Sequence, residues 1–210
     1  MRRPLVFRAV DAEPAELRVL GCLIEKQRTT PDAYPLSLNS LRLACNQTTN
    51  RDPVVSYEEP EIREALERLS RRGWVRLASA SRAIKYRHLF DDAVGLDDGE
   101  ISLLAVLMLR GPQTPGELKA RTERLHGFGS LDEVIATLER LSGRDLVERL
   151  ERRPGQKEDR YMQILGAEPE RSEPVRAAAG EARASLEERV ARLEAAVAAL
   201  QQELGVSPTS

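Results

Sequence analysis

Residues 61–70 read Glu-Ile-Arg-Glu-Ala-Leu-Glu-Arg-Leu-Ser, and residues 133–142 end in the same five residues, Leu-Glu-Arg-Leu-Ser. In both stretches the apolar residues recur every three or four positions, which is typical of an amphipathic helix. Each stretch runs directly into a short apolar strand pattern, at residues 74–77 and 146–150. A helix that buries one apolar stripe needs partners, so each copy predicts at least two further helices packed against it.

Two more helical patterns precede the first copy. One begins at Pro14, a residue favoured in the first helical turn, and extends to about Arg28. Ser37 is a good N-cap for a short second helix. The repeated helix follows, with a start near Glu58 or at a capping box two residues earlier. The alternating segments after it, within residues 74–88, predict a β-hairpin.

The second copy repeats this order in residues 91–165. Helix caps are expected at Asp97, Thr114 and Ser130, each followed three residues later by glutamate. Residues 146–165 predict a second hairpin. The first predicted helices of the two copies are 84 residues apart (101 − 17), but the repeated pentapeptides are only 72 residues apart (138 − 66). The first copy therefore holds about a dozen extra residues, in the loops at 29–35 and 46–53.

Three helices followed by a hairpin form the winged-helix arrangement. The sequence therefore predicts a mainly α chain with small β-hairpins, an α+β fold built from two tandem winged-helix domains and a C-terminal coiled-coil helix. The expected divisions are a lead (1–12), the first domain (13–90), the second domain (91–165), a linker (166–180), the coiled-coil helix (181–204) and a tail (205–210).

The C-terminal helix carries a heptad pattern with valine mostly at a and leucine at d, which favours a parallel pair of helices. Only about three heptads are present, so the stripe could instead fold back onto the winged helices. The predicted dimerisation residues are Leu186, Val190, Leu193, Val197, Leu200 and Leu204.

Composition narrows the functional classes. Aromatic residues are 4% of the 210, which favours helical packing over a β-sandwich, and no apolar run approaches the roughly 18 residues of a membrane span. Cys22 and Cys45 stand singly in apolar helical patterns and indicate a reducing compartment, so a cytoplasmic protein without membrane contact is expected. His88 and His126 have no further ligands at metal-binding spacing, so we expect no enzyme, cofactor or metal.

Charge is distributed unevenly. Residues 1–90 carry 16 Lys/Arg and 11 Asp/Glu (16 − 11 = +5), while residues 91–165 carry 11 and 15 (11 − 15 = −4). Between Trp74 and Phe90 there are four cations and no acid, which suits double-stranded DNA, although charge on a hairpin can also serve to protect an exposed edge. The candidate DNA-binding residues are Arg42, Asn46, Gln47, Asn50, Arg51, Arg63, Arg68, Arg71, Arg76, Arg82, Lys85 and Arg87.

The outer face of the third predicted helix centres on Glu64, Glu67 and Arg71. Its two carboxylates would repel phosphates, so strong recognition of bases by this helix is not expected. The corresponding helix of the second domain is also acidic, so that domain is expected to pack against the first domain or against a second chain, as a candidate site for a protein partner, rather than to contact DNA. The leading hypothesis is a dimeric DNA-binding protein, with transcriptional regulation as its suggested role. The alternative is a tandem winged-helix interaction adaptor, similar to the segregation-and-condensation protein B, without direct DNA binding.

Six motifs carry a resemblance to a known family: residues 25–41, 44–47, 50–54, 85–88, 109–118 and 154–158. Together they resemble the bacterial YceH family over residues 13–165. This resemblance implies a tandem winged-helix fold, often followed by a short coiled coil, and it supplies no catalytic residues.

Overall fold

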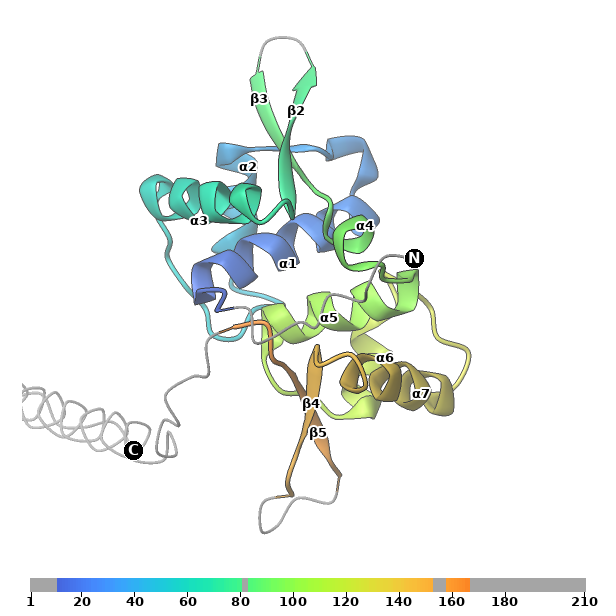
Figure 1. Ribbon diagram of the computed structural model, residues 1–210. Helices are drawn as coiled ribbons and strands as arrows, with labels where there is room; N and C mark the ends of the chain where they lie inside the picture. Colours follow the sequence, from blue (N-terminus) through green and yellow to red (C-terminus); the bar gives the residue numbers. More distant parts are fainter. Residues whose placement is uncertain (1–10, 81–82, 153–157, 167–210) are drawn as a thin grey trace, which may run out of the picture. The chain divides into compact units, whose positions relative to one another are not determined.

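The computed structural model describes residues 11–80, 83–152 and 158–166 and has a mixed α and β architecture (Figure 1). The coiled-coil positions 181–204, most of the linker, most of the lead and Arg82 lie outside these residues. The helices are α1 (Pro14–Thr29), the 3-10 turn η1 (Pro31–Ala33), α2 (Leu38–Cys45), α3 (Glu59–Arg71), α4 (Phe90–Val94), α5 (Asp98–Arg110), α6 (Pro115–Thr122) and α7 (Leu131–Ser142). The strands are β1 (Leu36–Ser37), β2 (Val75–Ala80), β3 (Ala83–His88), β4 (Val147–Leu150) and β5 (Arg160–Gln163).

The order of three helices and a hairpin occurs twice, as expected from the repeated stretch. We call residues 11–96 the first lobe and residues 97–166 the second lobe. In the first lobe β2 and β3 form the first hairpin, and β1 joins it in an antiparallel sheet of order β1-β3-β2. In the second lobe β4 and β5 form the second hairpin. The α+β class is confirmed, while β1 and α4 were not anticipated from the sequence.

Local capping explains where the helices begin. The side chain of Ser37 accepts a hydrogen bond from the Ser40 backbone N–H, so this predicted N-cap is confirmed. Asp97 and Thr114 form the predicted capping boxes at the starts of α5 and α6. Helix α3 begins at Glu59 with Glu58 as its N-cap, which decides between the two starts left open by the sequence.

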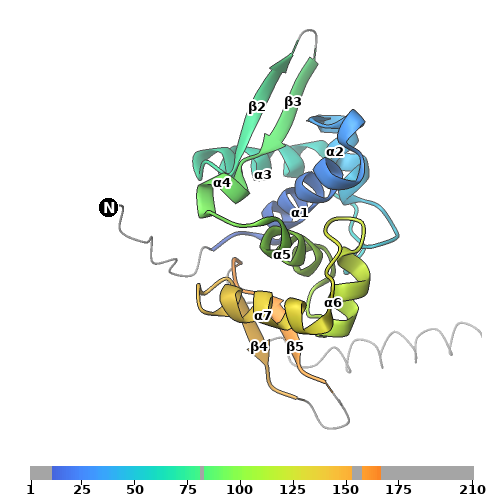
Figure 2. The ribbon, with the colours of Figure 1, turned by 90° about the vertical axis from the view of Figure 1, so that its right-hand side faces the viewer.

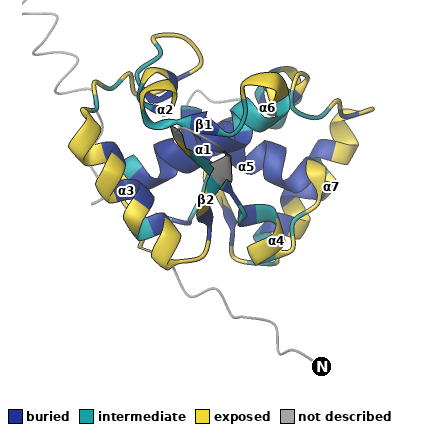
Figure 3. Cartoon of the chain, turned by 90° about the horizontal axis from the view of Figure 1, so that it is seen from above, coloured by how far each residue is buried: buried dark blue, intermediate teal, exposed yellow. Residues whose placement is uncertain are grey.

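The core lies around α1 and α5, the equivalent first helices of the two lobes. Both are buried over most of their length, and they pack against one another (Figure 3). Apolar side chains from both lobes form one continuous cluster that includes Leu20, Leu23 and Leu107. Backbone bonding reinforces this contact, because Ala12 N–H donates to the Leu165 carbonyl at 3.1 Å. The two lobes therefore share one core.

Gly21 marks the close approach of α1 to α5. A Cβ at this position would lie 2.9 Å from Leu109 Cγ and 3.2 Å from Met108 Cβ. We expect Gly21→Val to lower the free energy of unfolding by about 2 kcal/mol, because the added atoms overpack the shared core. Urea denaturation measures this change.

The matched control is Gly116→Ala in α6, where an added Cβ would meet nothing nearer than Thr114 Oγ1 at 4.0 Å. This substitution should leave stability unchanged or slightly raised. If Gly21→Val is as stable as the unsubstituted protein, the close packing of α1 on α5 is wrong.

Candidate nucleic-acid interface

The first hairpin presents its three described cations on one face. Arg76 pairs with Arg87 across β2 and β3, and Ala78 pairs with Lys85. Side chains alternate between the faces of a strand, so Arg76, Lys85 and Arg87 lie on the same side, which we call the cationic face. Four other arginines of the described first lobe form ion pairs: Arg51, Arg63, Arg68 and Arg72.

The cationic face carries positive charge that no described carboxylate neutralises. Like charges placed directly opposite one another, as in Arg76 and Arg87, destabilise a strand pair. The Nε atom of Arg87 is buried and has no hydrogen-bond partner among the described residues. Arg76 is exposed, while Lys85 and Arg87 are half-buried. An anion bound here would relieve the repulsion and supply hydrogen-bond acceptors.

The opposite face of the first hairpin is apolar. Val75 and His88 are buried where the hairpin meets the core, and further along Leu77 and Ile84 are 60% and 64% exposed. Figures 1 and 2 show β2 and β3 projecting beyond the helices of the first lobe. The apolar side chains of Leu77 and Ile84 on this face are therefore open to a partner.

The start of α2 lies close to the cationic face. Strand β1 pairs Ser37 with Lys85, and Ser37 is also the N-cap of α2. Helix N-termini carry a partial positive charge, which adds to the local potential of the cations. Arg42 on α2 is half-buried.

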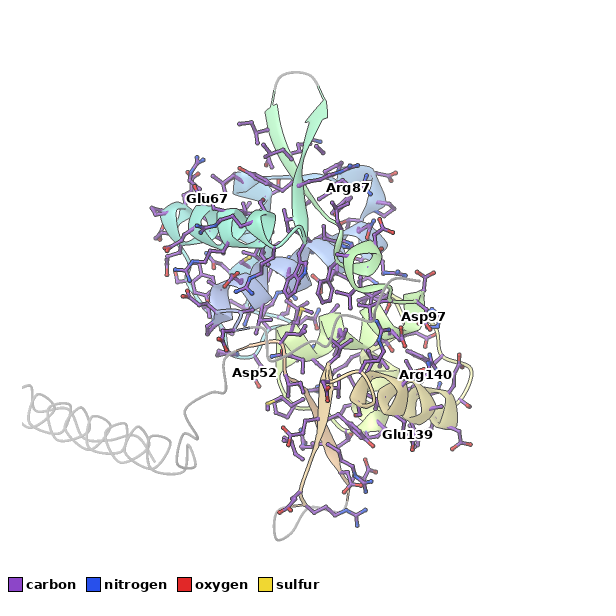
Figure 4. All side chains as sticks on the ribbon, viewed as in Figure 1. Asp52, Glu67, Arg87, Asp97, Glu139 and Arg140 are labelled. Carbon is purple, nitrogen blue, oxygen red and sulfur yellow. The ribbon has the colours of Figure 1, made fainter. Side chains whose placement is uncertain are left out.

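The outward surface of α3 is occupied by its own carboxylates. Glu64, Glu67 and Arg71 are exposed, as the helical pattern predicted, and Figure 4 shows Glu67 on this surface. Arg63 pairs with Glu59 at 3.5 Å, and Arg68 pairs with Glu64 at 2.7 Å. A further ion pair joins Arg68 to a glutamate at the start of α1. Two of the three predicted cations of α3 are therefore already neutralised.

The loop between α2 and α3 corrects part of the predicted interface. Asn46 exchanges two hydrogen bonds of 2.8 Å with the backbone of Tyr57, and Gln47 accepts one from Arg51. The side chain of Arg51 is 0% exposed and makes a two-pronged ion pair with Glu25, at 2.6 and 3.1 Å. These contacts hold the loop in place: Arg51 is buried among internal partners, Asn46 is bonded through both the oxygen and the nitrogen of its amide, and the Gln47 side-chain oxygen accepts an internal hydrogen bond.

The same loop also ties the first lobe to the second. The Asp52 backbone N–H donates to the Leu109 carbonyl at 2.8 Å, and the Asn50 side chain accepts from Arg110 at the end of α5. Asn50 has a φ of 61°, a left-handed conformation that asparagine tolerates better than most residues. These extra residues of the first copy thus join the lobes, a role that no short sequence motif signals.

A polar cluster at the base of the first hairpin was not found by sequence reasoning. The His88 imidazole contacts the Gln27 side chain through Nε2, and its Nδ1 lies 3.5 Å from Asp91 Oδ1. The Tyr34 hydroxyl accepts a 2.8 Å hydrogen bond from the His88 backbone N–H. Burial lowers the pKa of His88 to about 4, so the ring is neutral near pH 7.

The second hairpin differs from the first because its cations are paired. Asp159 accepts from Arg152 at 2.6 Å and also pairs with Arg149. Arg160 lies 3.3 Å from Glu117 on α6. Acidic side chains also line α7, where Figure 4 labels Glu139 beside Arg140. The described part of this lobe therefore offers little uncompensated positive charge.

Other chemistry has little support in the described residues. They contain no group of three or more His, Cys, Asp or Glu side chains placed to hold a metal ion. Cys22 and Cys45 are free thiols buried in the core, as expected. None of the described helices is long and apolar enough to cross a membrane.

Comparison with known proteins places the chain in a bacterial family. Residues 12–156 match the family described as "Protein of unknown function, DUF480". A UPF0502 protein of Pseudomonas aeruginosa is 45% identical over 191 residues, covering 87% of this chain and 84% of the relative. One from Paraburkholderia phymatum is 46% identical over 210 residues, covering 92% and 89%. In agreement with the YceH resemblance of its motifs, the chain belongs to the DUF480 family.

Proposed function

We propose that this protein is a non-enzymatic, double-stranded DNA-binding protein that engages DNA through its first lobe, with transcriptional regulation as its proposed role. The observation that carries the proposal is the cationic face, where three basic side chains gather without a described carboxylate partner. We further propose that each lobe is a winged helix. The repeated order of three helices and a hairpin supports this assignment.

The proposed interface is narrower than the set drawn from the sequence. It keeps the cationic face, together with Arg42, Arg71 and Arg82, the last of which lies outside the described residues. It leaves out Arg51 and the polar loop side chains, because internal hydrogen bonds occupy them. Arg63 and Arg68 are expected to contribute less to DNA binding, since each is paired with glutamate.

Salt dependence provides the test. If Arg76, Arg82, Lys85 and Arg87 each neutralise one phosphate, the log–log plot of affinity against salt should have a slope of about −3 to −4 per engaged lobe. Fluorescence anisotropy with a labelled mixed-sequence duplex measures this slope. Replacing all four side chains with glutamine should remove most of this slope.

Arg149→Gln, on the second hairpin, is the matched control and should leave the slope unchanged, because Asp159 already pairs with this arginine. Absence of binding to mixed duplex DNA at low salt would reject the proposed function, as would a slope near zero for the unsubstituted protein.

The second lobe supports a protein-binding adaptor as the other candidate function. Its α7 exposes Asp132, Glu133 and Glu139, and Leu131 beside them is 44% exposed. An acidic surface with an exposed apolar side chain fits a protein partner better than DNA. The acidic outer surface of α3 in the first lobe is a second support for this function. If Glu64→Lys with Glu67→Lys leaves capture of a partner unchanged while raising DNA affinity, α3 no longer supports the adaptor function.

Dimerisation through residues 181–204 remains a prediction from the heptad pattern. A chain ending at residue 168 is expected to be monomeric, and the full chain dimeric, because the six heptad residues supply the contact. Light scattering after size exclusion measures both masses. Equal oligomeric states would reject the coiled-coil dimer.

A further inference from the structure

We propose that the first hairpin, rather than α3, is the main DNA contact, and that it holds backbone phosphates without reading the base sequence. This inference rests on the proposed DNA-binding function and specifies how that function is performed. In many winged helices the third helix enters the major groove. Here the charges of the two elements point to a different arrangement.

Helix α3 is electrostatically unsuited to approach DNA closely. Glu64 and Glu67 are exposed on its outer surface, and each would be brought near phosphates if α3 entered a groove. Like charges brought close together repel one another even in water, and the repulsion is stronger where water is excluded. The cations that could offset this repulsion are only partly available, because Arg68 is held by Glu64 and by Glu13.

The first hairpin has the opposite balance. Its cationic face carries three positive charges, and the directly opposed Arg76 and Arg87 repel each other in the absence of an anion. A phosphate placed between them converts this repulsion into two charge-assisted contacts. The neighbouring pair, Ala78 and Lys85, lies two residues further along the hairpin, or about 7 Å. That distance is comparable with the step from one phosphate to the next along a DNA strand.

The position of the hairpin also favours this contact. It projects beyond the helices of the first lobe (Figures 1 and 2), so the backbone of a duplex can lie along the cationic face from Lys85 toward the base of the hairpin. Arg76 and Arg87 lie at that base, next to the buried pair Val75 and His88. Contacts to phosphates fix the position of a protein on DNA but carry no direct sequence information. Binding should therefore depend strongly on salt and weakly on base sequence.

The experiment compares three variants of the full chain by anisotropy on two 20-base-pair duplexes of unrelated sequence. The hairpin variant is Arg76→Gln with Lys85→Gln and Arg87→Gln, and it should lose about 100-fold in affinity at low salt. The α3 variant, Arg63→Gln with Arg68→Gln and Arg71→Gln, should stay within about threefold. The third variant, Glu64→Gln with Glu67→Gln, should bind about threefold more tightly because repulsion is removed.

A variant with Arg76→Gln alone shows whether affinity can be lost without loss of the fold. Arg76 is exposed, so its replacement should not disturb packing, whereas Arg87 is half-buried. It should lose about tenfold in affinity with an unchanged circular dichroism spectrum and melting temperature. The affinities of the unsubstituted protein for the two duplexes should agree within about threefold.

Two results overturn the inference while leaving DNA binding intact. One is a loss in the α3 variant as large as that in the hairpin variant. The other is a strong preference for one duplex that disappears when the α3 side chains are changed. If the unsubstituted protein binds neither duplex at low salt, the proposed function itself is rejected, and the two failures are thereby distinguished.

Discussion

Glu25→Ala is expected to lower the free energy of unfolding by about 3–5 kcal/mol, because it leaves the buried Arg51 guanidinium without its counter-charge. The Arg51 side chain is 0% exposed, and Glu25 meets it with both carboxylate oxygens. The remaining partners of Arg51 are neutral, at Ala44, Gln47 and Asn50. None of them can neutralise a charge that is removed from water.

The pair also anchors the loop that joins the lobes. Asn50 and Asp52, on either side of Arg51, bond to the C-terminal end of α5. Loss of Glu25 should therefore loosen the contact between the lobes as well as the interior of the first lobe. Urea denaturation with an unchanged m-value measures the loss of stability.

Two further variants make this prediction specific. Glu64→Ala removes an exposed ion pair with Arg68 and should cost no more than about 0.5 kcal/mol. Combining Glu25→Leu with Arg51→Met should recover much of the stability lost in Glu25→Ala, because no unpaired charge remains in the interior. A cost below about 1 kcal/mol for Glu25→Ala would show that Arg51 is not sealed from water as described.

Acidification from pH 6.5 to pH 4 is expected to destabilise the protein by up to about 3 kcal/mol through His88 alone. Burial lowers the pKa of this side chain from 6.5 to about 4. In the unfolded chain the imidazole takes up a proton below pH 6.5, whereas the folded protein takes it up only near pH 4. The stabilising contribution of the neutral ring is therefore complete above pH 6.5 and is lost as the pH falls to 4.

The surroundings of His88 explain why the neutral form is favoured. The ring is enclosed between α1, β3 and α4, and the positive charges of Arg28 and Arg87 oppose its protonation. Asp91, 3.5 Å from Nδ1, and Asp92 favour the charged ring, but their effect is smaller than that of burial. Protonation would thus charge the base of the first hairpin next to the cationic face.

His88→Gln tests this cause, because glutamine can still bond to Gln27 but takes up no proton. The variant should lose most of the dependence of stability on pH between 4 and 6.5, measured by urea denaturation at several pH values. The matched control is His126→Gln, at the only other histidine of the chain, which should keep that dependence. An unchanged pH profile in His88→Gln would assign the effect to other groups.

Local features of this protein were determined by its sequence. The 3.6-residue period of residues 61–70 and 133–142 predicted α3 and α7, and caps such as Ser37, Asp97 and Thr114 predicted where helices begin. These patterns depend on residues that are close in the sequence, so they can be recognised without knowledge of the tertiary contacts. The absence of acids between Trp74 and Phe90 likewise identified the first hairpin as the part with uncompensated positive charge.

Only the tertiary structure decided which polar side chains are available to a partner. Arg51 and Asn50 look like DNA-binding residues in the sequence, but they are bound to Glu25, 26 residues away, and to Arg110, 60 residues away. Nothing local distinguishes them from Arg76 or Arg87. An ion pair or a hydrogen bond depends on distances of a few ångströms between atoms, and packing of α1 on α5 sets those distances across the whole chain.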